Sequence, residues 1–317
     1  MGLMRYLSVV GLVLFGWVLY TSNVGKTVGI LASANPWFVL LGVLFVVFEV
    51  LVRSVGWKAL VNIWSKKYSL ADSAQTYMIG IAFGAVTPAK AGDFIKVGDL
   101  SGKTKLKLMK SFTIGLLDRL INFIFLFLSA CAGAVAVGMF LTGFSSQFDV
   151  LILLLAASII ALVAALNERV SLLVLRPLQM FLVPARFRGN AKELFRTFHE
   201  TVAEFKLSGL RWVVLALTLV SWAVIFVRPY FFARAVGMRV DWWVFLVFIP
   251  LISVVEVLPI SIMGLGTRDA SILFLFGIMG VERERMVALS ALIVLLSLVP
   301  QVVAGYLIAW THKVRVP

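Results

Sequence analysis

Long apolar runs constrain this sequence more than any other feature. Stretches of roughly 18 to 25 mostly apolar residues recur along the chain, the length that a helix needs to cross a hydrocarbon layer about 30 Å thick. Hydrophobic residues make up 62% of the 317, and only 14% are charged; the mean hydropathy is +1.04. A soluble domain cannot bury that much apolar surface. The sequence therefore predicts an all-α polytopic membrane protein.

We predict six full spans and two apolar segments that are broken in the middle by proline, glycine and acidic residues. The spans are 5–21, 36–60, 109–141, 150–166, 210–233 and 286–310, and the broken segments are 73–99 and 242–280. We expect a single membrane domain over 1–317, with a first half (5–141), a fourth span and cytoplasmic linker (142–208), and a second half (209–317).

Apolar residues recur at helical spacing within the polar stretch between the fourth and fifth spans. This pattern predicts an amphipathic helix on the membrane surface, and a solvated linker helix is the alternative. The residues are Ala191, Leu194, Phe195, Phe198, Val202 and Phe205.

The distribution of Lys and Arg predicts the orientation in the membrane. If each broken segment enters and leaves on one side, most of the 29 basic residues, Lys90 and Lys96 among them, fall in loops on a single side. Cytoplasmic loops carry such an excess, so we expect both termini in the cytoplasm and the protein in the cell membrane. The net charge of +14 has no basic soluble domain to carry it, which favours anionic lipid headgroups over nucleic acid.

In this orientation the broken segments enter from opposite faces, which indicates two re-entrant hairpins in an inverted repeat. Proline lacks an N–H and forces the preceding residue out of the helix. A broken backbone survives in hydrocarbon only where protein or water satisfies it. The helices that start after Pro88 and Pro259 would present N-termini, which favour anions. For the first segment, a cytoplasmic loop between two short helices is the alternative.

Polar and glycine residues at these breaks, with Asp118 and Arg119 in the first turns of the third span, form the candidate site, because ionisable groups within a membrane are costly and usually functional. For Arg119, an anchor at the cytoplasmic interface is the alternative. Arginine suits bidentate binding of a phosphate or carboxylate, although structural ion pairing is the competing interpretation. We expect Glu256 to pair with Arg268. The candidate substrate-binding residues are Lys90, Gly92, Asp93, Asp118, Arg119, Glu256, Gly264, Gly266, Arg268 and Asp269.

Other polar residues are interpreted structurally. Glu49 and Arg53 lie four apart and are expected to neutralise each other on one helix face, and Arg228 is expected to extend its charge to the membrane surface. The sequence has only two His, one Cys and no P-loop. We therefore expect no metal site, no cofactor and no ATPase activity.

Three stretches resemble a known family. TPAKAGDFIKV (87–97), LLDRL (116–120) and LPISIMGLGTRDASILFLFGIMG (258–280) are similar to signature stretches of the lysylphosphatidylglycerol synthase transmembrane-region family, also called flippase-like. The similarity covers about 5–310. Gly92-Asp93 and Arg268-Asp269 stand where the family has Gly-Glu and Arg-Glu, so each carboxylate is kept on a shorter side chain.

The resemblance implies movement of a lipid with a phosphate-bearing headgroup, a phospholipid or a polyprenyl-phosphate-linked glycan, between leaflets. We expect no synthase activity, because the sequence ends at Pro317 without an aminoacyl-transferase domain. One alternative is an intramembrane enzyme that acts on a phospholipid or polyprenyl-phosphate carrier through Asp93, Asp118, Glu256 and Asp269. Another is a non-catalytic scaffold for envelope glycosylation or lipid modification. The oligomeric state is open, with a homodimer among the alternatives.

Overall fold

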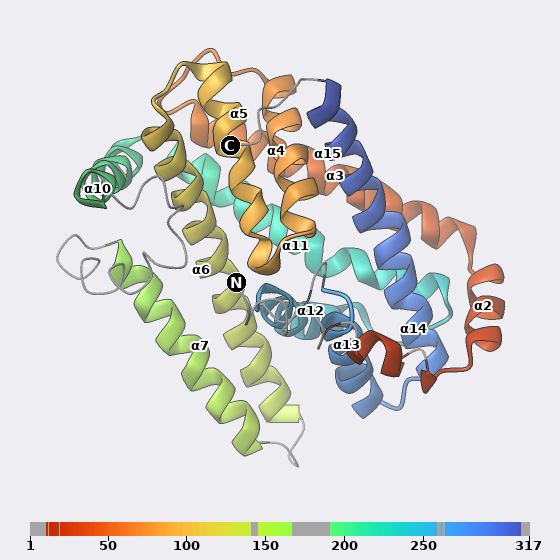
Figure 1. Cartoon of the computed structure of the whole chain (residues 1–317). Helices are drawn as coiled ribbons and strands as arrows, with labels where there is room; N and C mark the ends of the chain where they lie inside the picture. Colours follow the sequence, from red (N-terminus) through yellow and green to blue (C-terminus); the bar gives the residue numbers. More distant parts are fainter. Residues whose placement is uncertain are drawn as a thin grey trace.

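The computed structural model of the chain describes residues 11, 13–18, 20–140, 145–166, 191–258, 261 and 264–311. Every regular element within these residues is a helix (Figure 1), which confirms the all-α class. Helical residues between 11 and 20 come first. The elements that follow are α2 Val24–Ala32, α3 Pro36–Val61, α4 Leu70–Ala85, the 3-10 helix η1 Pro88–Phe94, α5 Ile95–Thr104, α6 Leu108–Phe140, α7 Ser145–Ala165, α10 Ala191–Leu207, α11 Arg211–Ala235, α12 Trp242–Val257, α13 Thr267–Ile278, α14 Arg283–Leu292, the π-helix η3 Ile293–Leu298 and α15 Val299–Thr311.

Four helices in the described part are long and apolar enough to cross a membrane. They are Pro36–Val61, Leu108–Met139, Arg211–Ala235 and the run Arg283–Thr311, which coincide with the second, third, fifth and sixth predicted spans. The fourth predicted span coincides with α7, whose described apolar stretch, Leu151–Val163, is shorter. Much of the first predicted span, 5–21, lies outside the described residues. The chain is thus an all-α membrane protein with four candidate spans in the described part.

Local capping explains where two of the helices begin. Asn35 accepts a hydrogen bond from the backbone N–H of Trp37 at 3.0 Å, and Pro36 occupies the first turn of α3. Ser69 accepts one from the N–H of Asp72 at 3.0 Å and starts α4. Such caps satisfy backbone donors that a helix end leaves open. The Ser69 cap thus fixes where the first broken segment starts after α3.

The long helices pack as neighbouring pairs around the two broken segments. Figure 1 shows α3 beside α11, α6 beside α7, and α15 beside α4. The hairpin formed by α4, η1 and α5 directs its turn towards the middle of the molecule, where η1 contacts α12. The first break therefore lies against an arm of the second broken segment.

The first break lies where the sequence predicts it. Thr87, which precedes Pro88, is extended at φ −115° and ψ 141°, as the proline ring requires. The Thr87 hydroxyl donates to the Phe83 carbonyl at 3.0 Å and accepts from the Gly92 N–H at 2.6 Å. A Cβ on Gly92 would lie 2.2 Å from the Phe83 oxygen, so only glycine allows this close return of η1 onto α4.

The second break separates α12 from α13 at residues 258–266. Pro259, which was expected to cause it, lies outside the described residues. Gly264 and Gly266 have φ values of +71° and +83°. A Cβ on Gly266 would lie 2.0 Å from the carbonyl oxygen of Gly11, so the N-terminal helix packs directly on this turn. The Gly266 N–H donates to Asp269 Oδ2 at 2.8 Å, and this bond satisfies a donor at the start of α13.

The predicted amphipathic helix exists as α10, but its apolar face lies on the protein. Phe198, Val202 and Phe205 pack into a buried cluster with residues of α3 and α6. The Thr201 hydroxyl lies 2.9 Å from that of Thr113 on α6. In the described part of the linker, α3 and α6 thus cover much of the apolar stripe, and the position of α10 relative to the membrane surface stays a prediction.

Candidate functional site

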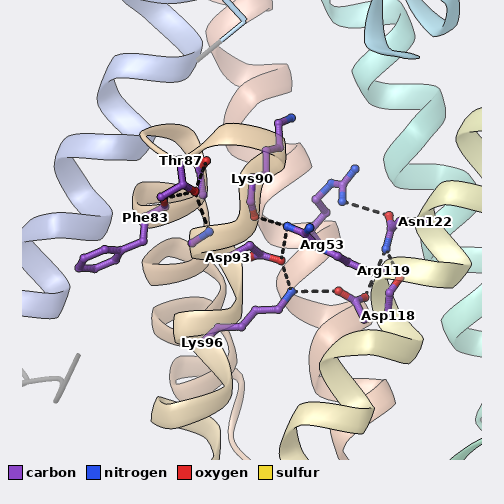
Figure 2. Close-up of polar contacts among 11 residues, drawn as sticks. Arg53, Phe83, Thr87, Lys90, Asp93, Lys96, Asp118, Arg119 and Asn122 are labelled. Atoms are coloured by element: carbon purple, nitrogen blue, oxygen red, sulfur yellow. Dashed lines mark hydrogen bonds and ion pairs between the residues drawn. The ribbon is translucent and has the colours of Figure 1, made fainter. Parts of the chain in front are cut away.

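Lys96 lies at the centre of the polar contacts beside the first break. Its side chain is only 2% exposed, and its Nζ atom lies 3.0 Å from an Oδ2 atom of Asp93 and 3.0 Å from that of Asp118 (Figure 2). The ammonium also lies over the Trp57 ring, 4.5 Å from its centroid. A buried lysine needs such partners, because an unpaired charge in a low-dielectric interior is very costly. Lys96 thus connects the hairpin to α6.

Arg119 is the second cation that contacts Asp93. Its guanidinium lies 3.6 Å from Asp93 Oδ2, donates to the backbone carbonyl of Lys90 and stacks over Phe94 at 4.9 Å. Lys90 itself has a left-handed φ of +54°, and its side chain points away from Asp93 (Figure 2). Lys90, one of the predicted site residues, therefore contributes its backbone carbonyl to the contact with Arg119. Its ammonium is exposed.

The polar contacts continue from α6 into α3 and α11. Asn122 donates to Asp118 Oδ1 at 3.3 Å and accepts from Arg53 at 3.3 Å (Figure 2). Arg53 lies 3.7 Å from Glu49, which also pairs with Arg228. We call this set the Lys96 network; its members are Glu49, Arg53, Asp93, Lys96, Asp118, Arg119, Asn122 and Arg228.

These contacts correct two interpretations that were made from the sequence. Glu49 and Arg53 do pair, but each is shared with a partner on another helix, so they are not a self-contained pair. Arg228 was expected to reach the membrane surface. It is instead 9% exposed and paired with Glu49, because α3 and α11 pack side by side and bring the two side chains together.

The Lys96 network carries an excess of positive charge. It contains four cations, on α3, α5, α6 and α11, and three carboxylates. Buried ion pairs add little net stability compared with apolar side chains of similar size. Stability alone therefore does not account for this concentration of charge, and the positive excess favours an anionic ligand.

The second break holds a smaller group, which we call the Arg268 cluster: Glu256, Arg268, Asp269 and Ser290. Arg268 is 4% exposed and lies 3.2 Å from Asp269 and 3.9 Å from Glu256, which is the expected partner. Its NH2 group lies 3.4 Å from the Ser290 hydroxyl, which in turn donates to Asp269. The Arg268 Nε–H is buried without an acceptor in the described structure. The Gly264 turn packs on Glu256, which holds this carboxylate against the arginine.

The structure thus gathers the ten predicted site residues into two groups, one at each break. Sequence reasoning missed Lys96, which it assigned to a cytoplasmic loop, and Arg53 and Arg228, which it treated as structural. Lys96 follows Asp93 by three residues, a spacing that brings side chains together on a helix, and this was an available signal. Within the described residues, no three His, Cys, Asp or Glu side chains come together as a metal site would require.

Comparisons with known proteins agree with the helical membrane architecture. The family model described as "Lysylphosphatidylglycerol synthase TM region" matches residues 7–305. A curated relative, the "UPF0104 membrane protein PH1989" of Pyrococcus horikoshii, is 23% identical, and the match covers 98% of each chain.

Proposed function

Because the chain belongs to the lysylphosphatidylglycerol synthase TM region family, we propose that it moves a lipid with a phosphate-bearing headgroup between leaflets. The two broken segments would be re-entrant hairpins of an inverted repeat that enter the cell membrane from opposite faces, with both termini in the cytoplasm. Their charged turns would give the headgroup a polar path, while the acyl or prenyl tails stay in the lipid. A headgroup needs such a path because crossing hydrocarbon without polar contacts is costly.

The observation that carries this proposal is the presence of charge at both breaks inside an apolar helical body. The Lys96 network and the Arg268 cluster each hold a buried or half-buried arginine against carboxylates. Structural pairing alone would not explain why both groups occur where a helix is interrupted. Broken helices with polar backbone at membrane depth are typical of substrate sites in transporters.

We assign the phosphate contact to Arg119 and Arg268. Each would bind the phosphate in place of a carboxylate partner. In the structure, Asp93 pairs with Arg119, and Asp269 and Glu256 pair with Arg268, so neither guanidinium is left as an uncompensated charge. When a headgroup arrives, its phosphate would replace a carboxylate, because Arg binds both oxyanions in the same bidentate geometry. The freed carboxylate would turn towards Lys96 or towards an amine on the headgroup.

A leaflet-resolved scrambling assay in proteoliposomes tests this proposal. Fluorescent phosphatidylglycerol and a fluorescent polyprenyl phosphate are reconstituted separately, and an impermeant quencher reports the fraction that changes leaflet. We expect Arg119→Ala and Arg268→Ala to slow exchange of the transported lipid at least about tenfold, the value of one lost charge-assisted hydrogen bond. Arg196→Ala, which removes an exposed arginine of α10, serves as the matched control.

Two results would contradict the assigned roles or the function. Exchange at the wild-type rate in both arginine variants would remove Arg119 and Arg268 from the path. Equal exchange in liposomes with and without the wild-type protein, for both lipids, would reject lipid movement as the function.

A further inference from the structure

The last span, which runs through α14, η3 and α15, carries buried polar side chains on the side that faces the protein. They are Ser290, Ser297 and Gln301. The opposite side of the same span is exposed and apolar, with large residues spaced four apart: Leu295, Val299, Val303 and Leu307. The periodicity of a helix thus separates the two sides, and we call the three buried polar residues the polar stripe.

The polar stripe connects the two broken segments. At one end, the Ser290 hydroxyl donates a hydrogen bond within the Arg268 cluster at the second break. At the other end, Gln301 lies about one turn before Gly305 on the same helix face. A Cβ on Gly305 would lie 2.2 Å from the Met78 carbonyl oxygen. This face therefore packs directly on α4, the arm that leads into the first break (Figure 1).

Two members of the polar stripe lack a partner within the chain. Ser297 is 4% exposed and Gln301 9%, and neither side chain has a hydrogen bond to another residue that the structure describes. Their polar atoms are not fully enclosed, so a molecule from outside the chain can reach them. Buried polar side chains are nearly always hydrogen-bonded, so both call for such a partner.

Other serines in apolar helices of this protein behave differently from Ser297. The hydroxyls of Ser129, Ser158 and Ser271 each donate to the carbonyl four residues earlier at 2.8 Å. Ser297 lies instead in the π-helix η3, Ile293–Leu298, where backbone hydrogen bonds join residues five apart. Short π-helical turns within α-helices occur frequently at functional sites. The Ser297 hydroxyl is thus available to a ligand.

The chemistry of the polar stripe differs from that of the charged groups at the breaks. A Gln amide and a Ser hydroxyl each donate and accept hydrogen bonds, and neither carries a charge. A ligand hydroxyl also donates and accepts, whereas an ammonium group only donates and a phosphate diester only accepts. The polar stripe therefore matches the hydroxyls of a polyol better than it matches an amine or the phosphate itself.

We propose that Ser297 and Gln301 bind hydroxyl groups of the transported headgroup. The inference rests on the proposed function and names its substrate class: a lipid whose phosphate is esterified to a polyol, either glycerol or a sugar. With the phosphate on Arg268, the polyol would extend from Ser290 along the polar stripe towards α4. A headgroup without hydroxyls would leave the amide and the hydroxyl unpaired, and sites of this kind reject such analogues strongly.

Scrambling of matched lipid pairs in proteoliposomes tests this assignment. Each pair has the same charge and the same tail and differs in the hydroxyls: fluorescent phosphatidylglycerol with phosphatidylmethanol, and glucosyl polyprenyl phosphate with methyl polyprenyl phosphate. We expect the wild type to move the hydroxyl-bearing member of one pair at least about tenfold faster. The pair that shows this selectivity distinguishes glycerol from sugar. Gln301→Met and Ser297→Ala should bring the ratio close to one, by slowing the hydroxyl-bearing lipid.

Control measurements separate lost recognition from a damaged fold. Neither variant should lower the thermal unfolding midpoint in detergent, because each removes a polar group that has no partner in the chain. A midpoint lowered in both would show that these side chains are paired within the protein and would remove the premise. Ser158→Ala, on α7, removes a hydroxyl that donates to its own helix and should leave the ratio unchanged.

Three results would overturn the hydroxyl contact and leave lipid movement through Arg119 and Arg268 standing. The first is a wild type that moves both members of each pair equally fast. The second is an unchanged ratio in both Gln301→Met and Ser297→Ala. The third is equal slowing of both members, which a general effect on the path would produce. Exchange of no probe by the wild type would instead reject the proposed function itself.

Discussion

Single residues in this protein gain their importance from the contacts they make across helices. The sequence predicted Asp93 as a candidate site residue because it lies at a break in an apolar chain, and Asp118 and Arg119 because they are charged residues in the first turns of a predicted span. It did not identify Lys96, because lysines near predicted loops are ordinary on a cytoplasmic face. Only packing reveals that Lys96 is buried between two carboxylates.

Removal of the Lys96 charge should destabilise the fold strongly. Lys96→Met keeps most of the unbranched side chain but leaves Asp93 and Asp118 without their shared cation, so we expect a loss of about 3 kcal/mol in the free energy of unfolding. Denaturant unfolding in mixed micelles measures it. The same change at exposed Lys107 should cost less than about 0.5 kcal/mol.

The loss of stability in Lys96→Met should come from the two carboxylates that the variant leaves unpaired. Adding Asp93→Asn and Asp118→Asn to Lys96→Met removes the unpaired charges and should restore much of the stability. Equal stability of Lys96→Met and Lys107→Met would show that the buried ion pairs do not hold the hairpin.

At the scale of elements, periodicity predicted the helix α10 but not the protein contacts of its apolar face. The apolar spacing from Ala191 to Phe205 belongs to α10, Ala191–Leu207. A stripe of apolar residues predicts that this face of the helix is buried. It does not show whether lipid or another helix buries it. Phe112 and Leu194 pack in one buried cluster, so α10 is a brace on α6.

A polar contact at the end of α10 makes this brace dependent on pH. Burial disfavours the charged form of Glu204, but hydrogen bonds from Lys110 and Trp64 outweigh it and lower the pKa of Glu204 below its ordinary value. The contact therefore contributes stability above the usual glutamate pKa of about 4.3 and loses it as the pH falls through the lowered pKa.

Comparison of Glu204→Gln with wild type across pH measures this contribution. At pH 7 the variant should unfold at a lower temperature than the wild type, and the difference should shrink as the pH falls below about 4. Glu193→Gln, at an exposed position of the same helix, is the control. A gap between wild type and Glu204→Gln that persists unchanged down to pH 2.5 would mean that the charge of Glu204 does not stabilise the contact.

At the scale of the whole molecule, the sequence predicted the two breaks but not how their charges connect. Proline and glycine act locally, so each interruption is visible in a short window. The partners of the Lys96 network are far apart in the chain: Lys96 and Asp118 are separated by 22 positions, and Glu49 and Arg228 by 179. Such pairs depend on how α3, α6 and α11 pack, which hydropathy and spacing do not encode.

The proposed lipid movement requires two hairpins that enter the membrane from opposite faces. Cysteine accessibility tests this directly, in a background where Cys131, the only cysteine, is replaced by Ser. Single cysteines at exposed positions flank each hairpin: Lys67→Cys and Lys107→Cys for the first, Arg239→Cys and Met279→Cys for the second.

An impermeant thiol reagent is applied to one face of sealed vesicles at a time. We expect positions 67 and 107 to react from one face, and positions 239 and 279 from the other. Reaction of 67 and 107 from opposite faces, or of 239 and 279 from opposite faces, would mean that the segment crosses the membrane and would contradict the opposed hairpins on which lipid movement is built.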